Sequence, residues 1–139
     1  MKIDSHHHFW KYEPVRYSWM NERMEILKRD YQPADLLIQI EKTGIDGVVS
    51  VQADQSMQET DELLEHASQH EFIKGVVGWF PLADPAVEEM LSGYSGNPWL
   101  KGVRHVVQDE PDDRFILGDA FNEGIRKLKK FDLVYDILI

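Results

Sequence analysis

The sequence predicts an α/β protein with a parallel sheet. Short runs rich in Val, Ile and Phe alternate with amphipathic helical patterns along the 139 residues. Several of the runs are almost continuously apolar, which is typical of strands covered on both faces. Strands that alternate with helices usually pair in parallel through right-handed crossovers. The order β-α-β-α-β-α-β-α-β therefore indicates one domain over residues 1–139.

The β-rich runs give the expected strands, which lie at residues 2–8, 47–53, 73–80, 100–107 and 133–139. The helical patterns between them predict helices at residues 33–43, 57–69, 85–92 and 119–130.

Local signals support the expected helix ends. Pro33 stands at a first helical position, and Gly44 stands where a helix is often terminated. Ser56 and Glu59 match a capping box, so we interpret Glu59 as a capping residue rather than a catalyst. Asp84 is the expected N-cap of the third helix.

Two parallel architectures fit this order: a doubly wound open sheet and a (β/α)8 barrel. No glycine-rich phosphate loop follows the first strand, which weakens the nucleotide-binding version of the open sheet. A barrel needs about 250 residues. This chain supplies about five strands and ends on the apolar run 136–139. We therefore expect the N-terminal part of a TIM-like barrel, truncated after the fifth strand.

Residues 9–32 are too long for an ordinary connection from strand to helix, and they are rich in aromatic side chains. Long loops of this kind cover the mouth of a barrel, where chemistry occurs. The segment could be a mobile lid or an aromatic plug packed on the rim, and the sequence favours neither.

Composition excludes several functions. The chain has no cysteine, so disulfides, thiolate metal sites and cysteine nucleophiles are absent. Its formal net charge is −10 without a basic patch, which argues against binding to nucleic acid or an anionic membrane. No signal peptide or membrane-spanning run is visible, and we expect a cytoplasmic protein. The sequence does not indicate the oligomeric state.

The sharpest local motif is the triplet of histidines that ends the first strand. Residues two apart on a strand point to the same side, so His6 and His8 should face one way and His7 the other. Two imidazoles at this spacing can share a divalent metal or hold a polar substrate group. They could instead be a tag remnant or plain surface residues. A zinc site also needs a further protein ligand.

Three other histidines remain. His66 and His70 lie four residues apart on the second helix among glutamates, and we expect them to be solvated. His105 lies on a strand.

The motif Ile3–Trp10, I-D-S-H-H-H-F-W, resembles the start of amidohydrolase-related proteins of the sugar-lactonase branch. Four later motifs resemble the second to fifth strands of that branch in the same order: Val51–Ala53 with Glu59–Thr60, Gly75–Trp79, Lys101–His105 and Asp132–Asp136. The resemblance spans essentially the whole chain.

This resemblance implies a (β/α)8 barrel that opens sugar lactones such as fuconolactone or rhamnonolactone by water attack on the carbonyl. His6 and His8 would position or polarise that carbonyl, with one zinc ion or without metal. The family's usual base, an aspartate on strand 8, and a histidine of strand 6 have no counterpart within residues 1–139. We therefore expect these residues alone to be inactive.

The strands carry further candidate binding residues, each with a structural alternative. Arg104 could clamp a substrate hydroxyl or carboxylate, or close the barrel by a salt bridge. Gln52 could bind sugar hydroxyls, or satisfy buried backbone groups. Asp136 could face the pocket or cap a buried network. Trp79 could stack on a sugar ring, although core packing is the commoner use, and His105 completes the set.

Two other functions stay open at this point. A metal-dependent decarboxylase of the same wider family would use the same histidines with a bound metal. A non-catalytic half-barrel would leave an open strand edge that invites association. The leading hypothesis is a hydrolase acting on a small-molecule lactone.

Overall fold

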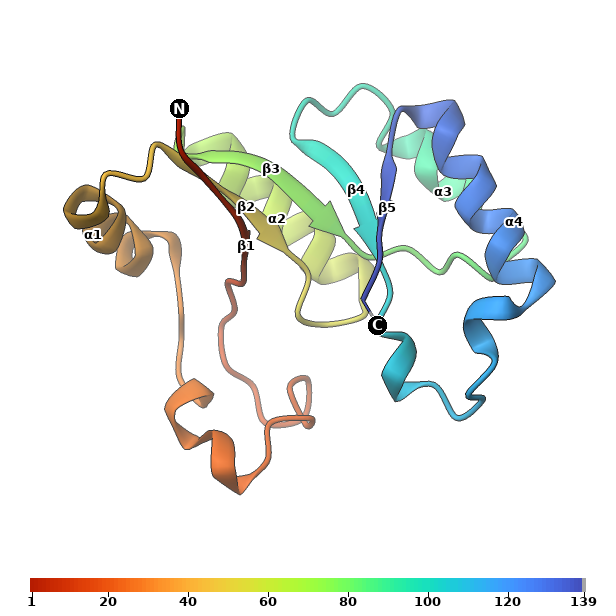
Figure 1. Cartoon of the computed structure of the whole chain (residues 1–139), viewed down its shortest axis with the longest axis horizontal. Helices are drawn as coiled ribbons and strands as arrows, with labels where there is room; N and C mark the ends of the chain where they lie inside the picture. Colours follow the sequence, from red (N-terminus) through yellow and green to blue (C-terminus); the bar gives the residue numbers. More distant parts are fainter. Residues whose placement is uncertain (139) are drawn as a thin grey trace.

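The computed structural model describes residues 1–138 and contains one sheet of five parallel strands. The strands follow each other across the sheet in chain order, from β1 to β5. Their bounds are β1 Ile3–His7, β2 Gly47–Val51, β3 Ile73–Gly78, β4 Leu100–Arg104 and β5 Val134–Asp136. Figure 1 shows the sheet curving as one part of a barrel wall, with β1 and β5 at its two edges. The expected half-barrel of five βα strands is confirmed.

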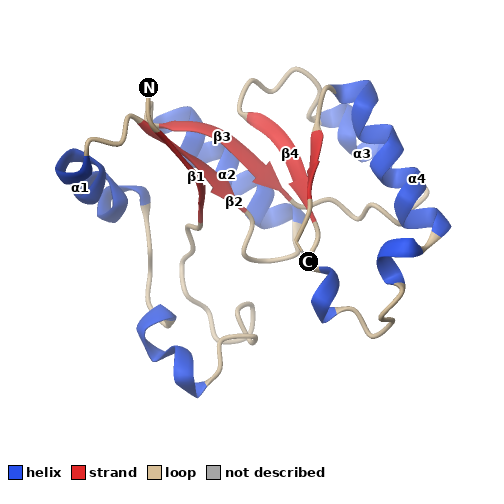
Figure 2. Cartoon of the chain, in the orientation of Figure 1, coloured by secondary structure: helices blue, strands red, loops and turns tan. Residues whose placement is uncertain are grey.

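Four α-helices connect or follow the strands: α1 Pro33–Thr43, α2 Met57–Gln69, α3 Val87–Gly93 and α4 Asp119–Leu128. Four short 3-10 helices lie at Glu22–Leu27, Val107–Asp109, Phe115–Leu117 and Lys129–Phe131. Figure 2 shows α2 behind the sheet and α3 and α4 beside its β4 and β5 side.

The first two helices have the bounds that the sequence predicts, and Gly44 ends α1 in the left-handed region with φ of 69°. The third helix begins two residues later than expected. Asp84 caps a turn instead of the helix, because its carboxylate accepts the N–H of Ala86 at 2.8 Å. The fifth strand is shorter than residues 133–139, of which residue 139 lies outside the described part.

The main hydrophobic core lies between the sheet and helices α2, α3 and α4. Alternate strand residues such as Val48, Val76 and Val103 are fully buried against Leu63 and Phe121 of the helices. This packing holds the strand ends, and the side chains that follow them, in fixed positions.

The approach between α4 and the segment after β3 is unusually close. A Cβ on Gly124 would lie 1.9 Å from the carbonyl oxygen of Leu82, so only glycine fits there. The helix is thereby set directly against the chain that leaves β3.

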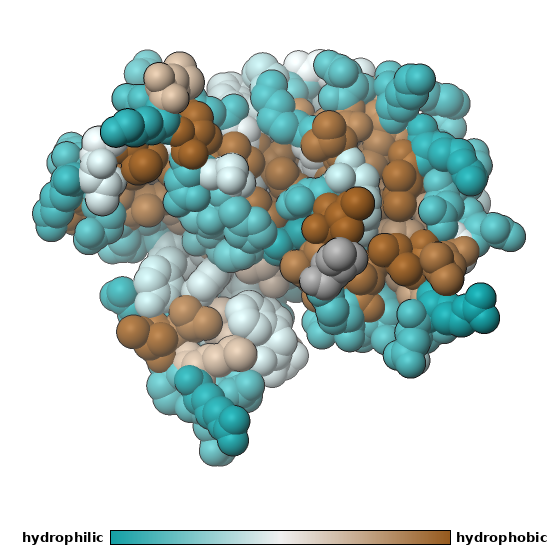
Figure 3. Space-filling model, viewed as in Figure 1, coloured by the Kyte–Doolittle hydropathy of each residue, from teal (hydrophilic) through white to brown (hydrophobic). Residues whose placement is uncertain are grey.

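The opposite side of the sheet is much less covered. Val134 on β5, whose side chain lies on this side, exposes 61% of its surface. Figure 3 shows apolar surface on this side of the molecule. A parallel sheet is normally buried on both faces. The uncovered face is therefore the one that would form the interior of a closed barrel.

Two long segments project from the carboxyl end of the sheet, as Figure 1 shows: residues 8–32 after β1, and residues 105–118 after β4. The first has its own small core, in which Trp10, Tyr17 and Met20 are buried. Trp10 and Tyr31 also pair in an antiparallel bridge with N–H to O distances of 3.0 and 2.9 Å. The segment is thus a packed unit at the rim. No helix in the described range 1–138 has both the length and the apolar character to cross a membrane.

Candidate active site

The histidine pair at the end of β1 forms the centre of the candidate site. The Nε2 atoms of His6 and His8 lie 3.2 Å apart, and the two rings meet edge to face. His7 points to the other face, where its Nε2 lies 3.4 Å from the Ser50 hydroxyl. This alternation is the one that strand geometry predicts.

The tautomer of His8 follows from its other ring nitrogen. His8 Nδ1 lies 2.8 Å from the carbonyl oxygen of Val51, so Nδ1 carries a proton and donates it. Burial lowers the pKa of His8 to about 4, which leaves the ring neutral near pH 7. Its Nε2 therefore presents a lone pair toward His6.

Arg104, at the end of β4, reaches the same place from across the sheet. Its Nη1 lies 3.2 Å from His6 Nε2. Its Nη2 donates to the carbonyl oxygen of Gln52 and to Gln52 Oε1, the latter at 3.3 Å. Within residues 1–138 the buried Nε has no hydrogen-bond partner, although Arg104 is only 5% exposed. The site thus holds a cation with an unused donor.

These contacts leave His6 two options. If His6 Nε2 carries a proton, it donates to His8 and cannot accept from Arg104. If it carries none, it accepts from Arg104, and two lone pairs face each other at 3.2 Å. In the second state a metal ion shared by the two histidines would have to replace Arg104 as the partner of His6 Nε2.

The pair fits one half of a zinc site. Two nitrogens at about 2.0–2.1 Å from a tetrahedral zinc ion lie roughly 3.3 Å apart, and the His6–His8 separation is close to that. Among the described residues, however, no group of three or more His, Cys, Asp or Glu side chains could hold a metal. The residues present could therefore supply two ligands and no more.

Gln52 and Asp136 flank Arg104. Gln52 is fully buried at the end of β2, and its Nε2 donates to the Arg104 carbonyl oxygen at 3.4 Å. Asp136 is the register partner of Arg104 on β5. Burial lowers the pKa of Arg104 and the Asp136 carboxylate opposes that effect. The structure thus gathers Gln52, Arg104 and Asp136 on the histidine side of the sheet ends.

Trp79 and His105 lie in a different cluster. Trp79 Nε1 donates to His105 Nδ1 at 3.1 Å, and His105 Nε2 lies 2.6 Å from the Glu110 carboxylate. The imidazole stacks on Phe115 and meets Phe121 of α4 edge to face. Both ring nitrogens are engaged on the helical side of the sheet. Substrate contact by Trp79 and His105 stays a prediction, and it would require these hydrogen bonds to be given up.

Glu59 does not complete the capping box expected from the sequence. Ser56 caps α2 as predicted, by accepting the Glu59 N–H at 3.2 Å. The Glu59 carboxylate, however, turns away from Ser56 and accepts the N–H groups of Ala53 and Asp54, both at 2.7 Å. The interpretation of Glu59 as a reciprocal cap is wrong, because the loop after β2 places closer donors within its reach.

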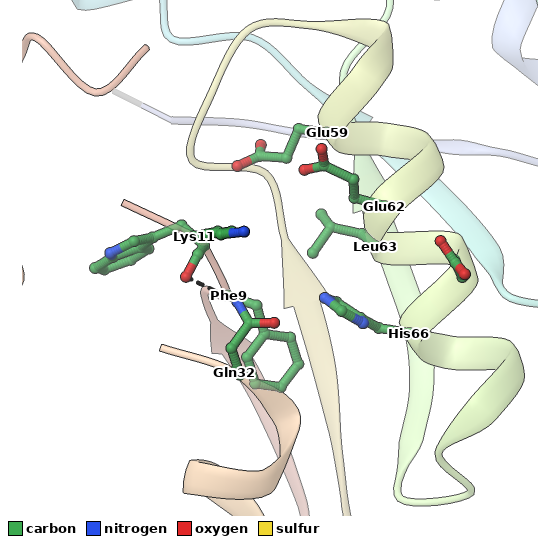
Figure 4. Close-up of a pocket in the computed structure, with 9 residues that line it drawn as sticks. Phe9, Lys11, Gln32, Glu59, Glu62, Leu63 and His66 are labelled. Atoms are coloured by element: carbon green, nitrogen blue, oxygen red, sulfur yellow. Dashed lines mark hydrogen bonds between the residues drawn. The ribbon is translucent and has the colours of Figure 1, made fainter. Parts of the chain in front are cut away.

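A small cavity of about 190 Å³ lies between α2 and the segment after β1. Figure 4 shows Glu59, Glu62 and His66 on α2 facing Lys11 and Gln32 across it. His66 is half-buried, its ring meets Phe9 edge to face, and burial lowers its pKa. The expectation that His66 is simply solvated is therefore wrong.

This chain is similar in sequence to curated proteins. A curated L-fucono-1,5-lactonase of Burkholderia multivorans is 39% identical over 140 residues, which cover all of this chain and 47% of that protein. A second, of Burkholderia ambifaria, is 29% identical over 138 residues, covering 99% of this chain and 48% of that protein. The chain thus spans about half the length of the curated relatives it matches.

A solved structure agrees with the fold. A crystal structure of an amidohydrolase from Burkholderia multivorans with bound zinc superposes with a TM-score of 0.94 at 37% identity. The superposition covers 100% of this chain and 49% of the crystallised amidohydrolase. The family model described as amidohydrolase matches residues 3–139, nearly the whole sequence. This chain therefore belongs to the amidohydrolase family.

Proposed function

We propose that the whole protein hydrolyses a small sugar-acid lactone by attack of water on the lactone carbonyl. The observation that carries the proposal is the convergence of His6 Nε2, His8 Nε2 and Arg104 Nη1 at the carboxyl ends of the strands. Barrel enzymes perform their chemistry at this end. The name of the two curated relatives, L-fucono-1,5-lactonase, supports this substrate class.

The residues fit the charge that develops in this reaction. Opening a lactone places negative charge on the carbonyl oxygen, and a fixed cation beside that oxygen lowers the barrier. Arg104 remains charged, and its Nη2 is held by Gln52. Its Nη1, which lies 3.2 Å from His6 Nε2, is the donor nearest to the place of the carbonyl oxygen, while His6 and His8 orient the substrate or the water. Asp136 stands beside Arg104, where a ring hydroxyl would bind. Gln52 is fully buried and would bind a hydroxyl only by giving up a side-chain hydrogen bond to Arg104.

The proposal includes two routes to polarisation of the carbonyl. In the first, the two histidines and Arg104 act alone. In the second, His6 and His8 hold one zinc ion together with ligands from outside residues 1–138. A bound zinc ion would act as a Lewis acid on the carbonyl oxygen. The zinc in the related crystal structure supports the second route.

The test is hydrolysis of a panel of aldonolactones, including L-fucono-1,5-lactone, by the whole protein, followed as acid release. We expect turnover that His8→Asn abolishes and that the control variant His70→Asn, just after the C-terminus of α2, retains. A panel left unhydrolysed above the spontaneous rate would exclude the proposal. We expect residues 1–139 alone to show no turnover.

A further inference from the structure

A buried carboxylate outside the candidate site connects two segments that border it. Glu59, in the first turn of α2, is 1% exposed. Its Oε2 accepts the two backbone N–H groups of Ala53 and Asp54, and its Oε1 accepts the Tyr17 hydroxyl at 3.2 Å. One side chain therefore ties the loop after β2 to the segment after β1.

The loop after β2 leads directly to the site. Ala53 and Asp54 follow Gln52, whose carbonyl and side-chain oxygens both accept from Arg104 Nη2. Any shift of the loop would move these oxygens and release the guanidinium. The direction of Arg104, and hence its distance to His6, depends on where Glu59 holds the loop.

The segment after β1 is anchored by the same group of residues. Tyr17 is 1% exposed and belongs to the small core of that segment. Beside it, Arg16 pairs with Asp54 at 2.8 Å and with Glu62 at 3.0 Å. The contacts of Glu59 and Arg16 thus fasten one rim of the barrel mouth to α2 and to the loop after β2.

The hydrogen bonds of the buried Glu59 carboxylate favour one position of the two segments that it joins. Burial of a carboxylate is unfavourable unless hydrogen bonds compensate for lost water. Glu59 receives that compensation from three donors on two different segments. If either segment moves away, the carboxylate loses hydrogen-bond partners while it remains buried, which penalises the movement.

We propose that Glu59 is a positioning residue, which fixes Gln52 and Arg104 in the site and holds the segment of residues 9–32 at the mouth. Its effect on catalysis rests on the proposed lactone hydrolysis, whereas its effect on the two loops does not. The length of the side chain is decisive, because only a glutamate or glutamine at this place spans both loops.

The test compares variants that change either the length or the charge of the side chain at position 59. Glu59→Asp keeps the charge and shortens the side chain, and Glu59→Gln keeps the length. Glu65→Asp is the matched control, since Glu65 is an exposed glutamate of the same helix. Tyr17→Phe removes only the hydroxyl group through which the segment after β1 bonds to Glu59. Amide hydrogen exchange of Ala53, Asp54 and residues 9–32 reports directly on both loops.

We expect Glu59→Asp to speed exchange at Ala53 and Asp54 by about tenfold or more, as loss of roughly 1.4 kcal/mol of local stability would. Glu59→Gln and Glu65→Asp should change the rate of exchange at these two amides little. Tyr17→Phe should speed exchange within residues 9–32 and leave Ala53 and Asp54 protected. Unchanged protection of these two amides in Glu59→Asp would overturn the proposal.

Turnover supplies a second measurement that a merely structural role would not affect in the same way. Glu59→Asp should lower kcat about tenfold in the otherwise unmodified protein. In a protein that already carries Arg104→Lys it should have no further effect, because residues that act through one network are not additive. Equal losses in both backgrounds would overturn the action through Arg104. If the unmodified protein hydrolyses no lactone, the proposed function fails, and the exchange measurements still decide whether Glu59 holds the loops.

Discussion

Two histidine clusters lie at the carboxyl ends of the strands, on opposite faces of the sheet. In the outer cluster, His105 has both ring nitrogens bound by Trp79 and Glu110, and aromatic side chains of the helical layer surround it. In the inner cluster, His6 and His8 direct their Nε2 atoms at each other. The inner pair lies on the face that the helices leave uncovered.

The difference shows that residue type and position at a strand end do not decide whether a histidine is available for chemistry. The hydrogen-bond partners decide it. Trp79 and Glu110 leave His105 no free lone pair, whereas Val51 fixes the tautomer of His8 and frees its Nε2. A histidine in the first situation is expected to affect stability, and one in the second to affect activity.

The largest expected effect concerns Arg104, which accompanies the inner pair. Arg104→Met should lower kcat for lactone hydrolysis about 10²–10³-fold, the usual cost of losing one donor to a developing oxyanion. Steady-state kinetics of the whole protein measures it. His105→Leu, compared at equal concentration of folded protein, should keep kcat within about threefold, since Trp79 and Glu110 occupy both ring nitrogens of His105. A comparable loss in both variants would break the distinction between the clusters.

The pH dependence of stability provides the next effect. Burial raises the pKa of Glu59 from 4.5 to about 7. Between these values the folded state binds more protons than the unfolded state, so this carboxyl stabilises the fold below pH 4.5 and loses that contribution as pH rises through 7. In Glu59→Gln the contribution is absent. The difference in unfolding free energy between the two proteins should change by about 3 kcal/mol over this window.

Urea denaturation of both proteins at several pH values measures that difference. Because each comparison is made at the same pH, titration of the histidines affects both proteins equally and cancels. A difference that stays constant from pH 4.5 to 7.5 would mean that the buried Glu59 does not titrate in this range.

A smaller effect should appear in the outer cluster. His105→Leu removes the partner of both Trp79 Nε1 and the Glu110 carboxylate. Buried polar groups left unpaired cost about 1–3 kcal/mol. Trp79 and Glu110 are half-buried, and we expect a loss of about 2 kcal/mol in the free energy of unfolding. Chemical denaturation checks this value. A variant as stable as the unmodified protein would show that the cluster contributes nothing to the fold.

The smallest expected effect tests zinc binding by the inner pair. Zinc at about ten times its dissociation constant would stabilise the protein by roughly 1.4 kcal/mol. Thermal melting with and without zinc should show this gain in the whole protein and in the His70→Asn control, and lose it in His8→Asn. If the unmodified protein gains no stability, the route that uses the histidines and Arg104 without metal is favoured.

The sequence by itself determined the alternation of strands and helices. The periodicity of apolar residues and the caps are local, and they placed α1 and α2 at their observed bounds. Strand geometry also placed His6 and His8 on one side, because side chains alternate whatever the rest of the fold does. The ordered motifs extended these local signals to the family.

Only the tertiary structure decided which side chains meet. Arg104 and His6 are 98 residues apart in sequence, and their contact depends on the order and register of four strands. Glu59 was misassigned for the same reason: a capping box is a local pattern, but the stronger donors came from the loop after β2 and from Tyr17. Hydrogen-bond partners distant in sequence leave no local signal, and they determine the chemistry of each residue.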